Sequence, residues 1–162
     1  MEKKWILVIV GLVFLAGWQA YYLYNEVNAK PEKKEAEAVE VAKKEENLAS
    51  IKNVDHFFKN ETYYVVEGEN EDGRDMIVWV GEDKKVYSEI AKKGLSEGQM
   101  IDYVKANHDA KEIIDIRLGM EDEIPLWEVV YLDDQDRYTY YYGYFETGKR
   151  YEIYRLKESE QK

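Results

Sequence analysis

The 162-residue chain has no cysteine, and this absence removes several classes of protein from consideration. Without thiols there is no disulfide framework, no cysteine nucleophile, no lipidated amino-terminal cysteine and no cysteine-based zinc site. Histidine is almost as scarce, because only His56 and His108 are present, far apart in the sequence and without metal-ligand spacing. We therefore expect no cofactor and no metal.

Catalytic motifs are also lacking. None of the four serines lies in a Gly-x-Ser-x-Gly or Ser-x-x-Lys context. The segment 68–73 suggests a calcium loop, but the first and last ligand positions of such a loop would be Gly68 and Trp79, which carry no carboxylate. Carboxylates are so numerous that no pair stands out for glycoside cleavage. The sequence predicts a protein that is not an enzyme and has no small-molecule substrate.

Positive charge is in deficit. Asp and Glu number 34 against 23 Lys and Arg, which gives a formal net charge of −11. A surface of this sign repels the phosphate backbone of nucleic acids. The composition therefore excludes nucleic acid as an expected partner.

Long apolar runs are absent except for one, at residues 5–24, which contains no charged side chain. A helix of about 20 residues spans a bilayer. Lys3 and Lys4 precede the run, which predicts a cytoplasmic amino terminus and an extracytoplasmic body. A cleaved secretory signal is the alternative, but aromatic residues occupy the place where small residues would mark a cleavage site. We expect a single-pass signal-anchor in the cell membrane.

The next segment favours a helix from about Pro31 to about Ser50, with Ala38, Val41 and Leu48 among the residues at helical spacing. Runs rich in β-branched and aromatic residues follow, separated by Gly, Asn and Asp, as in an antiparallel meander. The expected strands cover 55–58, 62–67, 75–80 and 85–87.

The same order then recurs. Ser96 and Gln99 have the spacing of a capping box and predict a helix from Ser96 to about Asn107. Strands are expected at 111–118, 124–132, 137–145 and 150–155. A constant offset of 63 residues relates Val41 to Val104, Tyr64 to Trp127, Val66 to Val129, Arg74 to Arg137, and Trp79 to Tyr142. These pairs predict a duplicated module, with chance similarity of two meanders as the alternative.

Several short motifs carry a family resemblance. In the second half these are Trp127-Glu128-Val129, the tyrosine-rich strand 138–142 and Thr147-Gly148-Lys149, an order that resembles the PepSY pattern. In the first half, segments 64–68, 77–80 and 92–96 are similar to the amino-terminal domain of the cell wall elongation regulator TseB-like family of Gram-positive bacteria.

The resemblance implies an α+β protein with an N-terminal transmembrane helix followed by two tandem cystatin-like/PepSY-type modules, each one helix packed on a curved antiparallel sheet. It also implies action with an elongation-specific penicillin-binding protein, and it brings no catalytic residues. The expected division is a cytoplasmic tail, the anchor, a juxtamembrane linker, a first module, a second module and a C-terminal tail, at 1–4, 5–24, 25–34, 35–94, 95–157 and 158–162.

Tyrosine is the one residue type in surplus that suggests recognition. Strand alternation sends Tyr138, Tyr140, Tyr142 and Tyr144 to one face, opposite the face that a helix would cover. Packing within the protein, including cross-strand contact with Trp127 or Tyr131, is one interpretation. Partner binding is the other, and it makes these four tyrosines the candidate contact residues.

The function expected from these observations is that of a membrane-anchored binding and regulatory protein of cell wall elongation. A PepSY-type inhibitor or chaperone of an extracytoplasmic peptidase is the alternative. A wall-cleaving or wall-building enzyme is disfavoured, since no nucleophile motif is present.

Overall fold

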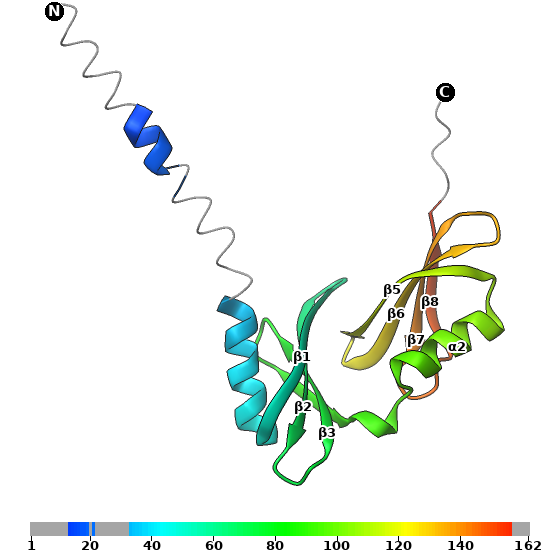
Figure 1. Cartoon of the computed structure of the whole chain (residues 1–162), viewed down its shortest axis with the longest axis horizontal. Helices are drawn as coiled ribbons and strands as arrows, with labels where there is room; N and C mark the ends of the chain where they lie inside the picture. Colours follow the sequence, from blue (N-terminus) through cyan, green and yellow to red (C-terminus); the bar gives the residue numbers. More distant parts are fainter. Residues whose placement is uncertain (1–12, 20, 22–32, 157–162) are drawn as a thin grey trace, which may run out of the picture. The chain divides into compact units, whose positions relative to one another are not determined.

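A computed structural model describes residues 13–19, 21 and 33–156 (Figure 1). The chain divides into two units, Met1–Glu37 and Ala38–Lys162. In the first unit, residues 13–19 and 21 are helical, and the remainder of the predicted anchor lies outside the described residues. No helix among the described residues is long and apolar enough to cross a membrane.

The second unit contains two antiparallel sheets. A helix over residues 33–46 is followed by four strands, β1 (Leu48–Phe58), β2 (Thr62–Asn70), β3 (Asp75–Gly81) and β4 (Val86–Ile90). A short 3-10 helix, η1 (Ala91–Lys93), precedes α2 (Glu97–Asn107), β5 (Ala110–Glu121), β6 (Ile124–Asp133), β7 (Tyr138–Tyr144) and β8 (Arg150–Arg155). The strand orders are β1-β2-β3-β4 and β5-β6-β7-β8. The α+β class, with a helix before each meander, is confirmed.

The first helix ends earlier than the sequence predicted. Asn47 has a φ of 50°, in the left-handed region where asparagine is one of the few residues tolerated at a helix end. Leu48 and Ser50, predicted as helical, are therefore the beginning of β1. The buried positions of this helix are Ala38 and Ala42, which pack on the first sheet.

The second helix begins where its capping box predicted. The Ser96 side chain accepts from the Gln99 amide at 3.3 Å, and the Gln99 side chain accepts from the Ser96 amide at 2.9 Å. The helix buries two of its own side chains completely, those of Met100 and Val104. Ala38 and Ala42 are buried on the first helix as Met100 and Val104 are on α2, so burial relates Val104 to Ala42, one residue from the predicted Val41.

The register of the two sheets reproduces the internal repeat. Tyr64 pairs with Val80 in the first sheet, and Trp127 pairs with Gly143 at the same place in the second. The paired residues of β2 and β3 thus recur 63 positions later in β6 and β7. The edge strands β1 and β5 also carry irregularities in register at corresponding places. This agreement supports a duplicated module over chance similarity.

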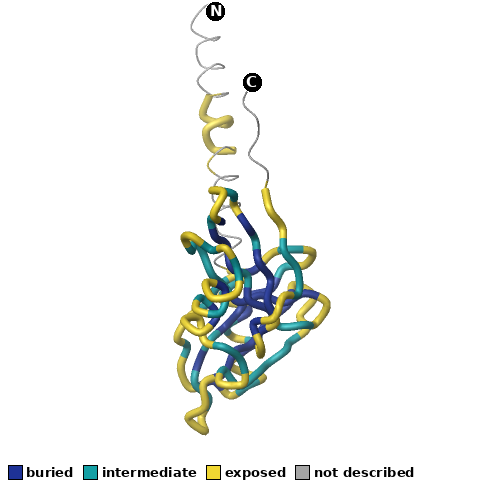
Figure 2. Tube along the Cα trace, turned by 90° about the vertical axis from the view of Figure 1, so that its right-hand side faces the viewer, coloured by how far each residue is buried: buried dark blue, intermediate teal, exposed yellow. Residues whose placement is uncertain are grey.

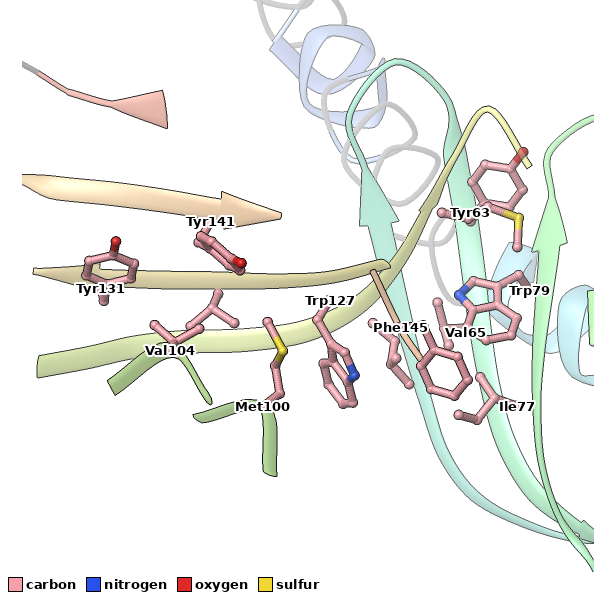
Figure 3. Packing of buried hydrophobic residues seen from close by; sticks show 13 residues of the cluster. Tyr63, Val65, Ile77, Trp79, Met100, Val104, Trp127, Tyr131, Tyr141 and Phe145 are labelled. Carbon is pink, nitrogen blue, oxygen red and sulfur yellow. The ribbon is translucent and has the colours of Figure 1, made fainter. Parts of the chain in front are cut away.

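Two hydrophobic clusters form the interior. One lies between the first helix and the first sheet. The other surrounds α2 and the second sheet and extends to Tyr63, Val65 and Trp79 on the far face of the first sheet (Figure 3). There the Phe145 ring meets Trp79 edge-on, with centroids 5.7 Å apart. The buried segments follow the strands, whereas turns are exposed (Figure 2). The second cluster therefore joins the two sheets, and the predicted domain boundaries stay predictions.

Candidate partner-binding surface

Side chains of β7 alternate between the two faces of the second sheet, as predicted. Thr139 and Tyr141 are buried on the α2 side. On the opposite face Tyr138 and Tyr144 are 48% and 40% exposed. The alternation is therefore confirmed by burial, and it leaves aromatic rings at the surface.

We call this opposite face the tyrosine face, formed by Tyr138, Tyr140, Tyr142, Tyr144, Tyr151 and Tyr154. Its rings form two edge-to-face pairs. Tyr142 meets Tyr154 at 6.0 Å, and Tyr144 meets Tyr151 at 5.6 Å between centroids. Such pairs favour a defined orientation for the exposed rings of Tyr144 and Tyr154. The two β8 tyrosines were not predicted. Tyr151 and Tyr154 are three residues apart, so strict alternation would send them to opposite faces, and an irregularity in the β7–β8 register accompanies their presence on the same one.

The expected cross-strand contacts with Trp127 and Tyr131 are wrong. These two residues pair with Gly143 and Thr139, so they lie on the α2 side of the sheet. Side chains in a strand alternate strictly, and contacts on one face connect residues that are directly paired. Tyr142 accordingly faces Glu128, to which its hydroxyl donates at 2.6 Å. Burial and this hydrogen bond raise the pKa of Tyr142.

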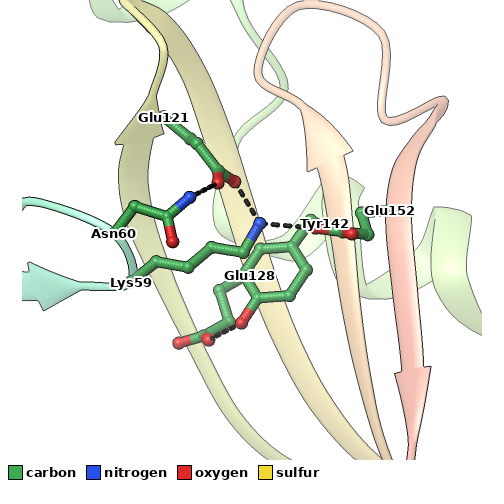
Figure 4. A network of polar contacts seen from close by, with 6 residues as sticks. All are labelled: Lys59, Asn60, Glu121, Glu128, Tyr142 and Glu152. Atoms are coloured by element: carbon green, nitrogen blue, oxygen red, sulfur yellow. Dashed lines mark hydrogen bonds and ion pairs between the residues drawn. The ribbon is translucent and has the colours of Figure 1, made fainter.

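Tyr142 differs from its neighbours because the first sheet covers it. Lys59, at the tip of the β1–β2 hairpin, pairs with Glu121 and with Glu152, the latter at 2.5 Å (Figure 4). Its ammonium lies 4.5 Å from the centre of the Tyr142 ring. We call these four residues the Lys59 cluster. Tyr142 is only 6% exposed, so it contributes to packing between the sheets rather than to an open surface.

The cluster combines one lysine with two glutamates, and the side chains of Lys59 and Glu121 are only 13% and 7% exposed. Burial disfavours the Lys59 ammonium, but its hydrogen bonds to Glu121 and Glu152 outweigh this effect and raise the pKa of Lys59. The same bond to Lys59, with one from Tyr154, lowers the pKa of Glu152. Both groups are charged at neutral pH, so the cluster serves to position the hairpin.

Other polar residues singled out from the sequence have structural partners. Ser88 donates to Glu46 at 2.5 Å, and Ser96 caps α2. His108 ends α2 and packs on Tyr141, with ring centroids 4.4 Å apart. Within the part of the chain that the structure describes, no group of three or more His, Asp or Glu side chains is placed to hold a metal ion.

Comparison with known proteins places the chain in a family. The family described as "Cell wall elongation regulator TseB-like domain" matches residues 37–81, from within the first helix to the end of β3. A protein of Bacillus subtilis (strain 168) named "Probable cell wall elongation regulator TseB" is 36% identical over 154 residues, which cover 92% of this chain and 96% of the relative.

The fold has a solved counterpart. The structure described as "YpmB protein from Bacillus subtilis" matches with a TM-score of 0.71 and 36% identity, over 75% of this chain and 96% of that chain. Identity of this extent along almost the whole length shows common descent and a common fold. The chain belongs to the family of TseB-like cell wall elongation regulators.

Proposed function

We propose that the protein regulates cell wall elongation without catalysing a reaction, by binding a wall-synthesis protein of the penicillin-binding class. The relationship to the B. subtilis regulator over 92% of the chain carries this proposal. The tyrosine face supplies the contact, because exposed aromatic rings in fixed orientations are typical of binding surfaces.

Within this face, the proposed contact residues are the accessible ones. Tyr138, Tyr144 and Tyr154 are 48%, 40% and 47% exposed, and Tyr140 is half-buried. Tyr142 is not a proposed contact residue, because Lys59 and Tyr154 pack against its ring. A partner that covers the three exposed rings would bury aromatic area at low cost in conformational entropy.

We further propose that residues 5–24 anchor the protein in the cell membrane, with both sheets outside the cell, and that the modules are of cystatin-like type, the second resembling PepSY. An anchor of this kind confines the modules beside other membrane-tethered proteins. Confinement raises the effective concentration of the two partners, so a contact of modest affinity gives high occupancy.

The test is capture of penicillin-binding proteins by full-length protein from detergent-solubilised membranes, detected with a fluorescent penicillin. Tyr138→Ser and Tyr144→Ser are the informative variants. Each should weaken capture by about 5- to 150-fold, the range for a residue at the centre of an interface. Their melting temperatures should stay close to that of the parent, because the rings are largely exposed.

Phe58→Ser is the matched control. Phe58 is 69% exposed and lies on β1. It is not one of the residues that form the tyrosine face, although the next residue, Lys59, contacts Tyr142. Its replacement should leave capture unchanged. Equal capture by all three variants would refute the assignment of the face. Capture of a peptidase in place of penicillin-labelled protein would favour the alternative role as a peptidase inhibitor or chaperone.

A further inference from the structure

A cleft of about 580 Å³ lies between the two sheets, on the α2 side of the second sheet. Its apolar lining includes Val65 and Ile77 from the first sheet, with Leu118 and Trp127 from the second. Leu95, in the segment that connects the sheets, also lines it. A volume of this size is typical of a ligand site and admits two or three side chains.

One carboxylate in the cleft breaks the internal repeat. Glu67 lies half-buried in β2, on the same face as Val65, and accepts a hydrogen bond from the Asn53 amide at 3.1 Å. The equivalent residue of the second module is Val130, which is 8% exposed. Glu67 is more exposed than Val130, so its carboxylate is accessible from the cleft. The first module thus presents a charged group where the second has an apolar one.

The rest of the rim is acidic as well. Asp55 and Glu97 line the cleft with Glu67. Of the two basic residues in the lining, Arg117 is already paired, with Asp115 and, at 3.4 Å, with Glu128. Lys92 is then the remaining cation of the lining. The rim thus favours positively charged groups.

The amino end of α2 does not offset this preference. A helix amino terminus attracts anions through its free amide groups. Here the Ser96 and Gln99 amides are already bound within the capping box, and the Met100 amide donates to the Ser96 carbonyl at 2.9 Å. Glu97 adds a negative charge at the same end.

We propose that this cleft binds an extended protein segment in which apolar side chains alternate with lysine or arginine. The apolar side chains enter the lining of Val65, Ile77 and Leu118, and the cations pair with Glu67 and the other rim carboxylates. The site is distinct from the tyrosine face, because Trp127 and Tyr142 lie on opposite faces of the second sheet. It does not depend on the proposed role in elongation.

The probe is a dye-labelled five-residue peptide of alternating leucine and lysine. It is titrated by fluorescence anisotropy against full-length protein in nanodiscs of zwitterionic lipid, with empty nanodiscs as background. We expect saturable binding that weakens as salt concentration rises. An otherwise identical peptide with glutamate in place of lysine should bind at least tenfold more weakly.

The deciding comparison is Glu67→Gln against Glu71→Gln. Both remove one negative charge, but Glu71 is an exposed residue of the β2–β3 turn outside the cleft. Glu67→Gln should weaken peptide binding about fivefold, the effect of one partly exposed ion pair, while Glu71→Gln leaves it unchanged.

A second variant, Ile116→Trp, fills the cleft from a half-buried position of its lining and should also reduce binding. Thermal melting establishes that each variant is folded. Equal effects of the two glutamate variants, equal binding of the acidic peptide, or no saturable binding of the basic peptide would each overturn the proposal.

Discussion

Replacing Lys59 by methionine tests how the two sheets are held together. The substitution keeps the aliphatic stem and removes the ammonium that pairs with Glu121 and Glu152. Glu121, only 7% exposed, then loses its counter-charge and retains the Asn60 amide. Removing one partner of a buried ion pair costs about 3–5 kcal/mol. Glu152 is about one-third exposed and regains water, so we expect a loss of about 2–3 kcal/mol in the free energy of unfolding.

The measurement is urea and thermal unfolding followed by circular dichroism. A loss of this size should lower the melting temperature by about 6–12 °C in a unit of this length. The matched control is Lys52→Met, which breaks an ion pair with Asp75 whose side chains are 49% and 59% exposed. Exposed pairs contribute about 0–1 kcal/mol, so the control should change little.

A double variant separates the charge effect from lost packing. In Lys59→Met with Glu121→Gln, the buried carboxylate is neutral, and the total loss should be smaller than the sum of the single losses by at least about 1 kcal/mol. Additive losses, or a Lys59→Met cost no larger than that of Lys52→Met, would refute the assigned role of the cluster.

The pH dependence has a definite sign. The pKa of Glu152 is lowered in the folded protein, so its contribution to stability is present above the ordinary value of 4.5 and is lost as pH falls below it. The pKa of Lys59 is raised, so its contribution is present below 10.5 and is lost as pH rises past the folded value. The difference between parent and Lys59→Met should be largest between these limits.

Three further predictions concern single sites. A Cβ at Gly119 would lie 2.6 Å from the Phe57 ring, so Gly119→Ala should cost about 1–3 kcal/mol, and Phe57→Leu should relieve part of this loss in the double variant. Burial lowers the pKa of His108 in the folded protein, so protonation of this histidine favours the unfolded chain. As pH falls from 7.5 to 5, the parent should therefore lose more free energy of unfolding than His108→Gln, as measured by chemical denaturation. Ser96→Ala removes the α2 cap and should cost about 1 kcal/mol in the same assay, whereas an unchanged value would show the cap to be dispensable.

Local chemistry made much of the fold predictable. The capping box of Ser96 and Gln99 acts within four residues, and the strands alternate over short distances, so both could be found in the sequence. The end of the first helix was missed because Leu48 continues the helical spacing of apolar residues, while the left-handed backbone of Asn47 stops the helix. Asparagine at that position was the available signal.

Long-range contacts made the site only partly predictable. Alternation placed four tyrosines of β7 on one face, but it could not show that Lys59 would cover Tyr142. Lys59 and Glu121 are 62 residues apart, and a sequence rich in both charges offers many equivalent pairings. The sequence likewise identified Glu67 only as one residue of an expected strand. Its difference from the second module became clear once the strand pairing aligned it with the buried Val130.

Photo-crosslinking in living cells can detect the proposed contact between the tyrosine face and a wall-synthesis protein where it would occur. A photoreactive amino acid at Tyr144, and separately at Phe58 as the control position, would be irradiated during growth, and the products identified by mass spectrometry. We expect a penicillin-binding protein to be crosslinked from position 144 and not from position 58. A penicillin-binding protein crosslinked from Phe58 and not from Tyr144, or a peptidase as the product at Tyr144, would contradict it.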